Sequence, residues 1–303
     1  MKILIVSTYY NAPHFMKLQV DSIRKFVAES FDFIAINDAD IDTKSVLSGK
    51  LASGEIYDEC NRLNVKQLRV PQTVHRHILD GGLVPNDMPT SHPTERHRAC
   101  IHWLLRYGLE SIDYKKYDAL MLMESDLFVY DRLDIHGLFK NYDIVGSGSK
   151  NRRLVKTGAA WEYWPERLGN CKEITLDFFN SQLLIVNMNT VANIDKLNIS
   201  GFAGSDTGAM TGLFLKDNQN YRYRIVNTSP CKEEQIDLFF VMDDTKYDLI
   251  HYRGGSNWDY QNIEYYTEKL NRMINKYMLS SNKLPTSKIN LTSRDNEHTF
   301  YGE

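Results

Sequence analysis

One stretch, YDALMLMESDLFVYD at residues 117–131, constrains the fold of this chain more than any other. Ala119 to Met123 is apolar without alternation, which is typical of a strand covered on both faces in the middle of a mostly parallel sheet. The apolar run stops at two acids, Glu124 and Asp126, before Leu127 to Tyr130 resumes as a second short strand. Because open α/β sheets bind ligands at the carboxyl ends of their strands, these acids could hold a hard divalent cation. An acidic turn without a ligand is the alternative that this stretch alone leaves open.

Length and charge restrict the class of protein. With 303 residues, 42% of them hydrophobic and 25% charged, the chain can bury a substantial core, and we predict one α/β domain with elaborations. The net charge of −3 gives no global field that would attract nucleic acid or an anionic membrane. We interpret the largest basic cluster as a solvated loop rather than a binding patch; it comprises Lys150, Arg152, Arg153 and Lys156.

The predicted location is cytoplasmic. Met1 to Ser7 passes into a strand within two residues, so we expect no signal peptide, and no run approaches the roughly 18 apolar residues of a membrane span. The cysteines are far apart and form no CxxC pair, which favours reduced, structural thiols. They are Cys60, Cys100, Cys171 and Cys231.

The chain opens with the pattern of a β-α-β unit. Ile3 to Val6 reads as a buried strand followed by a loop at Thr8 to Asn11, and Phe31 to Ile36 as a second strand that ends in Asn37 to Asp40. Between them, apolar residues at helical spacing predict an amphipathic helix: Met16, Val20, Ile23 and Val27. Such a unit commonly begins a nucleotide-binding sheet, although no GxGxxG fingerprint follows the first strand.

A long loop and a helix separate this unit from the acidic strand. Pro71 to Pro93 is too long for a simple connection and is a candidate binding loop. The next helix is predicted to bury a stripe made of Cys100, Trp103, Leu104 and Tyr107. Arg96 and Arg98 lie near its start, where a helix favours anions, and are candidate diphosphate contacts; solvated arginines are the alternative.

The second half adds shorter elements. A strand at Tyr142 to Val145 is expected to end at Gly146-Ser147-Gly148, a helix to cover Glu233 to Val241, and the last strand to run from Lys246 to Ile250. The crowded aromatics Trp161 and Trp164 suggest either a platform for a sugar ring or base, or ordinary packing.

The last predicted strand delivers a chemically suggestive segment. His251 can bind a metal, Arg253 can grip phosphate, and the glycine pair that follows allows close approach of a ligand. A terminal amphipathic helix is then predicted from apolar residues spaced three and four apart, namely Ile263, Tyr266, Leu270, Met273 and Tyr277.

With these residues in view, the chain resembles the GT-A superfamily of nucleotide-sugar-dependent glycosyltransferases over about residues 1–258. The opening β-α-β, YDALMLMESDLFV, FFNSQLLIVNM, SDTGAM and the late histidine carry the resemblance. ESD stands where that superfamily has its DxD motif, with Glu124 in place of the first Asp. FFNSQLLIVNM is similar to the family-8 motif FNSGVLLINL, and HYRGGSNW to the late metal-binding histidine segment of that family.

The resemblance implies a Rossmann-like α/β fold of GT-A type, with a mixed, mostly parallel central sheet flanked by helices. It implies a glycosyltransferase domain at 1–260, a helix at 261–280 and a polar tail at 281–303. The nucleotide-sugar-binding half would be 1–130 and the acceptor-binding half 131–260.

Site residues follow from the same resemblance. Asp126 and His251 would hold Mn2+ or Mg2+ at the donor's diphosphate, and Glu124 would contact the metal or the ribose. The implied donor contacts are Thr8, Tyr9, Asp38, Arg98, Glu124, Ser125 and Arg253. The implied acceptor contacts are Trp161, Trp164 and Asn180.

The implied reaction moves a sugar from a nucleotide sugar, by superfamily frequency a UDP-sugar, to a hydroxyl of an acceptor. That acceptor is expected to be a glycan, with a modified nucleic acid as a further option. Asp206 resembles the base of the inverting family-2 ED motif, whereas the DQ of retaining family-8 enzymes serves differently. We favour inversion because Thr207, not Gln, follows Asp206.

Two other functions remain open from the sequence. A sugar nucleotidyltransferase would share the fold, but the chain lacks a GxGxR-type loop after its first strand. A non-catalytic nucleotide- or glycan-binding module is compatible with the replacement of the first Asp by Glu124.

Overall fold

The computed structural model describes residues 1–74, 97, 100–101, 103–155, 173–197, 199, 208, 211–232, 235–253 and 263–279. Its helices are α1 (Phe15–Phe26), α2 (Ala52–Leu63), α5 (Ile135–Phe139), α7 (Thr211–Asp217) and α8 (Ile263–Met273). Short 3-10 turns cover Glu110–Ile112, Tyr114–Lys116 and Ile194–Lys196, and π-helical turns cover Leu104–Gly108 and Ile274–Leu279. Within these ranges, no helix is both long and apolar enough to span a membrane.

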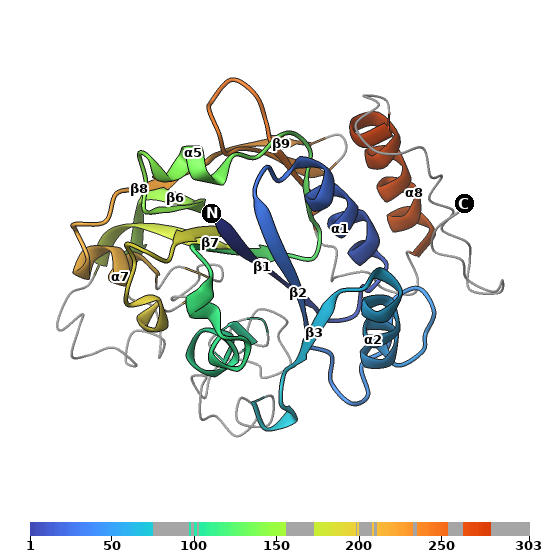
Figure 1. Ribbon diagram of the computed structural model, residues 1–303. Coiled ribbons are helices and arrows are strands. Elements are labelled where there is room, and N and C mark those ends of the chain that lie inside the picture. Colours follow the sequence, from blue (N-terminus) through green and yellow to red (C-terminus); the bar gives the residue numbers. More distant parts are fainter. Residues whose placement is uncertain are drawn as a thin grey trace.

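A seven-stranded sheet forms the centre of the molecule, in the order β3-β2-β1-β4-β7-β6-β8 (Figure 1). Its strands are β1 (Lys2–Tyr9), β2 (Ser30–Asn37), β3 (Lys66–Arg69), β4 (Ala119–Glu124), β6 (Ile144–Val155), β7 (Glu173–Asn187) and β8 (Tyr223–Ile225). β7 runs antiparallel to both β4 and β6, and the other neighbouring pairs are parallel. The predicted α/β class, with a mixed and mostly parallel sheet flanked by helices, is confirmed.

Alternation along β1 distributes its side chains to two cores. Ile3 and Ile5 face α1 and α2, where they pack with the predicted stripe that includes Met16 and Ile23. Leu4 and Val6 point to the opposite face, where they pack with the helical segment at residues 100–112. Since both faces of β4 are also covered, its unbroken apolar run is explained, and the strand lies fourth of seven in the sheet.

A second, four-stranded antiparallel sheet has the order β5-β11-β10-β9. It comprises β5 (Leu127–Val129), β9 (Asn227–Cys231), β10 (Ile236–Phe240) and β11 (Leu249–His251). Phe128 and Ile250 of this sheet form a third core with Phe15 of α1 and with Leu270 and Met273 of α8. β5 follows β4 after a two-residue turn, so the chain passes from the large sheet to the small one at the acidic residues.

Three expectations from the sequence are wrong. Within the segment predicted as a helix, Glu233–Val241, residues Ile236–Phe240 form strand β10 instead. Ile236 and Leu238 pack in the third core, whereas Phe239 packs in the first. The glycines after Val145 do not end their strand, since β6 continues to Val155. A Cβ at Gly148 would lie 2.0 Å from the carbonyl oxygen of Phe178, so glycine there permits close approach of β7.

Tyr107 does not join the buried stripe and is 67% exposed. The turn at Leu104–Gly108 is π-helical, with the Leu109 N–H bonded to the Leu104 carbonyl at 2.8 Å. The wider turn shifts the helical phase, so Leu105 is buried in place of Tyr107.

Candidate metal and nucleotide-sugar site

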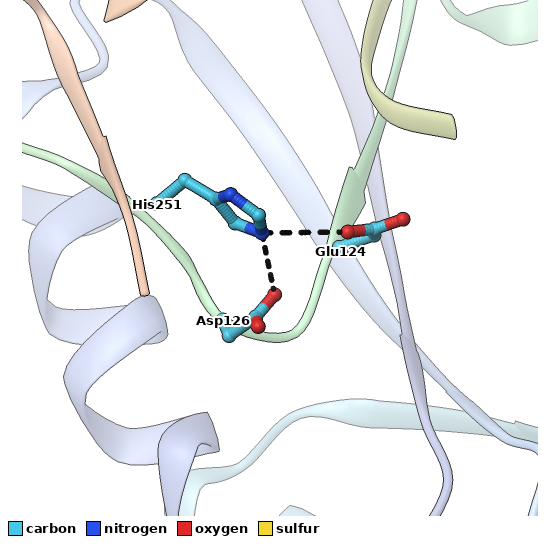
Figure 2. Close-up of side chains that lie close together, drawn as sticks. All are labelled: Glu124, Asp126 and His251. Atoms are coloured by element: carbon cyan, nitrogen blue, oxygen red, sulfur yellow. Dashed lines mark ion pairs between the residues drawn. The ribbon is translucent and has the colours of Figure 1, made fainter. Parts of the chain in front are cut away.

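Strand pairing brings the acidic turn and the late histidine together. Glu124 is the last residue of β4, Asp126 lies in the turn, and Leu127 opens β5. β11 pairs antiparallel with β5, with His251 opposite Leu127. His251 therefore belongs to the strand, one residue beyond the predicted end, and its register fixes it beside the turn (Figure 2).

The three side chains converge on one point, as the close-up shows (Figure 2). The Nε2 atom of His251 lies 3.4 Å from Oδ1 of Asp126 and 3.6 Å from Oε2 of Glu124. One potential ligand atom from each residue lies within 4.8 Å of the other two. Two carboxylate oxygens and an imidazole nitrogen are a donor set that fits a divalent cation such as Mn2+, with positions left for other ligands.

Asp237 orients the histidine from behind. It is the partner of His251 across the β10–β11 pair, and its Oδ2 lies 3.4 Å from the Nδ1 of His251. Arg253 binds the same carboxylate through two donors, Nε to Oδ2 at 2.6 Å and Nη2 to Oδ1 at 2.5 Å. An acid that accepts from Nδ1 leaves Nε2 free for a metal, which is the usual arrangement around a ligating histidine.

Electrostatic interactions keep Glu124 and Asp237 ionised. Burial by itself would raise the pKa of Glu124, but the hydrogen bond to His251 and the nearby charges of His97 and His251 bring that pKa down to about 2. The pKa of Asp237 is also lowered to about 2, because His251 and Arg253 outweigh its burial. Burial opposes protonation of His251, yet Asp126, Asp237 and Glu124 together raise its pKa well above the ordinary value. These acids therefore favour the protonated form of His251.

A buried glutamine holds the acidic turn in place. Gln19 of α1 donates from Nε2 to the carbonyl oxygens of Glu124 at 2.7 Å and Leu127 at 2.8 Å. Its Oε1 accepts from the hydroxyl of Tyr9 at 2.5 Å. Tyr9 is completely buried, and its ring supports the turn from within the core; the donor contact implied for Tyr9 stays a prediction.

Two other side chains lie near Oε1 of Glu124, the carboxylate oxygen that is not the one paired with His251. Ser181 of β7 donates to Oε1 of Glu124 at 2.7 Å, and Nε2 of His97 lies 4.0 Å from the same oxygen. The other ring nitrogen of His97 lies 3.2 Å from the Thr8 hydroxyl. Thr8 is thus placed within the site's surroundings through His97, a residue that the sequence placed near a helix start without giving it a role.

The remaining predicted residues divide into two groups. Asp38 is 3% exposed and donates its backbone N–H to the Tyr9 carbonyl at 2.9 Å, while Ser125 lies in the acidic turn and Asn180 in β7. Their ligand contacts stay predictions. Arg98, Trp161, Trp164 and Asp206 lie outside the described residues, as do the tail at 281–303 and nearly all of the loop at Pro71–Pro93.

Sequence reasoning also missed Asp237 and Gln19. Asp237 was hidden by the wrong helix assignment, since a strand at IDLFF would have placed it opposite the histidine strand. A glutamine within the apolar stripe of α1 was the available signal for a buried polar contact.

No protein-family model matches the chain, and no curated protein matches it. Among solved structures, it is similar to the mannosyltransferase Ktr4p from S. cerevisiae, at 8% identity and a TM-score of 0.36, covering 63% of this chain and 57% of that one. It is also similar to the mannosyltransferase PcManGT from Pyrobaculum calidifontis, in complex with GDP-Man and Mn2+. The identity is 8% and the TM-score 0.38, and the match covers 74% of this chain and 54% of that one. The chain is also similar to mouse xyloside xylosyltransferase 1, at 14% identity and a TM-score of 0.33, covering 74% of this chain and 77% of that one.

The chain thus spans little more than half the length of the two mannosyltransferases. Identities and TM-scores this low do not assign it to a family. What can be inferred about function depends on the geometry of the site itself.

Proposed function

We propose that this chain is a metal-dependent glycosyltransferase that moves a sugar from a nucleotide-sugar donor to an acceptor hydroxyl. The observation that carries the proposal is the convergence of Glu124, Asp126 and His251 at the carboxyl end of β4. An acidic strand end alone is common. Here, however, the buried imidazole of His251 is also oriented by the carboxylate of Asp237, as ligating histidines usually are.

Asp126 and His251 would hold the cation, with Glu124 as the third ligand or as a contact to the ribose. Mn2+ suits this mixed set better than Mg2+, because Mg2+ in proteins is held mainly by oxygen. When bound, the cation would neutralise negative charge that develops on the departing diphosphate.

The chain's own groups would assist that departure. Arg253 has five N–H donors, and Asp237 engages only Nε and Nη2, so donors remain for a phosphate. The bidentate pair also fixes the plane of the guanidinium. Glu124 is held by Ser181 and flanked by His97. Its ionised carboxylate can accept a hydrogen bond from a hydroxyl of the nucleotide sugar.

The finer parts of the proposal rest on the sequence resemblance and, for the donor nucleotide, on superfamily frequency. We propose a UDP-sugar as the first donor to test, a glycan hydroxyl as the acceptor, and inversion with Asp206 as the base. The base must lie beside the acceptor hydroxyl, and Asp206, which lies outside the described residues, is proposed for this role because its sequence context resembles the inverting family-2 motif.

A panel of UDP- and GDP-sugars, each scored for slow hydrolysis with Mn2+, tests the proposal. Turnover of one donor that requires Mn2+ and disappears in Asp126→Ala is expected. Asp244→Ala is the matched control, because Asp244 is 65% exposed and pairs with Arg224 on the surface. Undiminished hydrolysis in Asp126→Ala would refute the metal assignment.

The same panel separates the other two functions. Consumption of a nucleoside triphosphate and a sugar phosphate would identify a nucleotidyltransferase. Saturable binding of nucleotide or glycan without turnover of any donor would identify a binding module.

A further inference from the structure

A buried lysine of α8 contacts the two residues that follow the metal-site histidine. Lys269 of α8 is 3% exposed, and its Nζ donates to the carbonyl oxygen of Arg253 at 2.9 Å. The same ammonium lies 4.0 Å from the centroid of the Tyr252 ring. Both contacts are to the two residues that immediately follow His251.

No carboxylate of the described residues neutralises this lysine directly. Among the described residues, Lys269 forms no ion pair within 4.0 Å, and its hydrogen-bond partner is a neutral carbonyl. It nevertheless interacts electrostatically with Asp126, Asp237 and Arg253. Burial lowers its pKa to about 8, so the amine is mainly cationic at pH 7.

A charge count shows what this cation does to the site. Among the described residues of this cluster, three carboxylates, Glu124, Asp126 and Asp237, face two fixed cations, Arg253 and Lys269, when His251 is neutral as a metal ligand. The cluster then carries one net negative charge, and a divalent ion changes it to one net positive charge. Burial keeps such a charge poorly screened.

We propose that Lys269 couples the two ligands of this site, opposing the binding of a free divalent cation and favouring the cation together with a diphosphate. The inference rests on the proposed function, because it takes the second ligand to be a nucleoside diphosphate. Lys269 is a positioning and charge-balancing residue here, since it acts through the field at the metal site and through the Tyr252–Arg253 segment. The result is a site that fills with both ligands rather than with metal alone.

The test compares Lys269→Met with Lys269→Arg and with Arg272→Met, a control on the same helix whose side chain is 53% exposed. Mn2+ binding alone is measured by the loss of the free-ion signal in electron paramagnetic resonance. UDP and GDP binding at saturating Mn2+ is then measured by calorimetry. Lys269→Gln repeats the comparison if the methionine variant does not fold.

Lys269→Met is expected to bind Mn2+ alone more tightly and the nucleoside diphosphate more weakly, by roughly fivefold in each case. Lys269→Arg and Arg272→Met are expected to remain close to the wild type in both measurements. If Lys269 had a purely structural role, Lys269→Met would lower the affinity for both ligands together. That result, or no change in either affinity, would overturn the inference. If the wild-type protein binds Mn2+ neither alone nor in the presence of UDP or GDP, the proposed function fails together with the inference.

Discussion

The Nε2 atom of His251 lies 3.4 Å from Oδ1 of Asp126, although Asp126 lies in the turn between β4 and β5 and His251 ends β11, far along the chain. The pairing of β5 with β11 creates this proximity. Ligand chemistry at this point therefore depends on the small sheet as much as on the large one.

Gln19→Leu should destabilise the protein by about 3 kcal/mol, because the carbonyls of Glu124 and Leu127 and the hydroxyl of Tyr9 would lose a buried partner. Urea unfolding monitored by circular dichroism measures the change. Glu268→Gln, which removes one end of an exposed pair with Arg272, should change stability by less than about 0.5 kcal/mol. Equal stability of Gln19→Leu and the wild type would contradict the support assigned to Gln19.

Two glycine substitutions should act in opposite directions. Gly148→Ala should destabilise the protein by about 2 kcal/mol or more, since the new methyl would meet the Phe178 carbonyl at 2.0 Å. Gly54→Ala, in α2 with nothing within 4 Å, should stabilise it by about 0.5–1 kcal/mol. Thermal unfolding of both variants provides the comparison, and a harmless Gly148→Ala would show that β6 and β7 do not approach closely there.

Stability of the metal-free protein should fall as the solution becomes more alkaline. The folded-state pKa of His251 is raised by its acidic neighbours, so its contribution is complete below the unfolded pKa of about 6.5 and is lost as pH rises through the folded value. Urea unfolding with a chelator at pH 6 and at pH 9 tests this. The decline should be smaller in His251→Gln, and an equal decline in both proteins would assign it to another group.

Much of this arrangement could be predicted from local sequence. β4 had an unbroken apolar run and α1 had apolar residues at helical spacing, so both elements were found. The carboxyl end of β4 then indicated where the acids would lie. β10 was missed because a short segment of five residues with an apolar pattern does not separate helix from strand.

The rest of the site depends on long-range pairing. Asp237 meets His251 only because β10 and β11 adopt one register, and Lys269 reaches Arg253 only because α8 packs on the small sheet. Neither relationship has a local signature. For Tyr9, the resemblance implied a donor contact, and only the fold shows that its side chain packs into the core and bonds to Gln19.

The central claim is that Asp126 and His251 bind the same cation, and a double-mutant cycle on Mn2+ affinity tests it most directly. Asp126→Ala and His251→Ala should each weaken Mn2+ binding by at least roughly tenfold, and the double variant should lose less than the sum of the two effects in free energy. Wild-type Mn2+ affinity in either single variant would contradict a shared cation site.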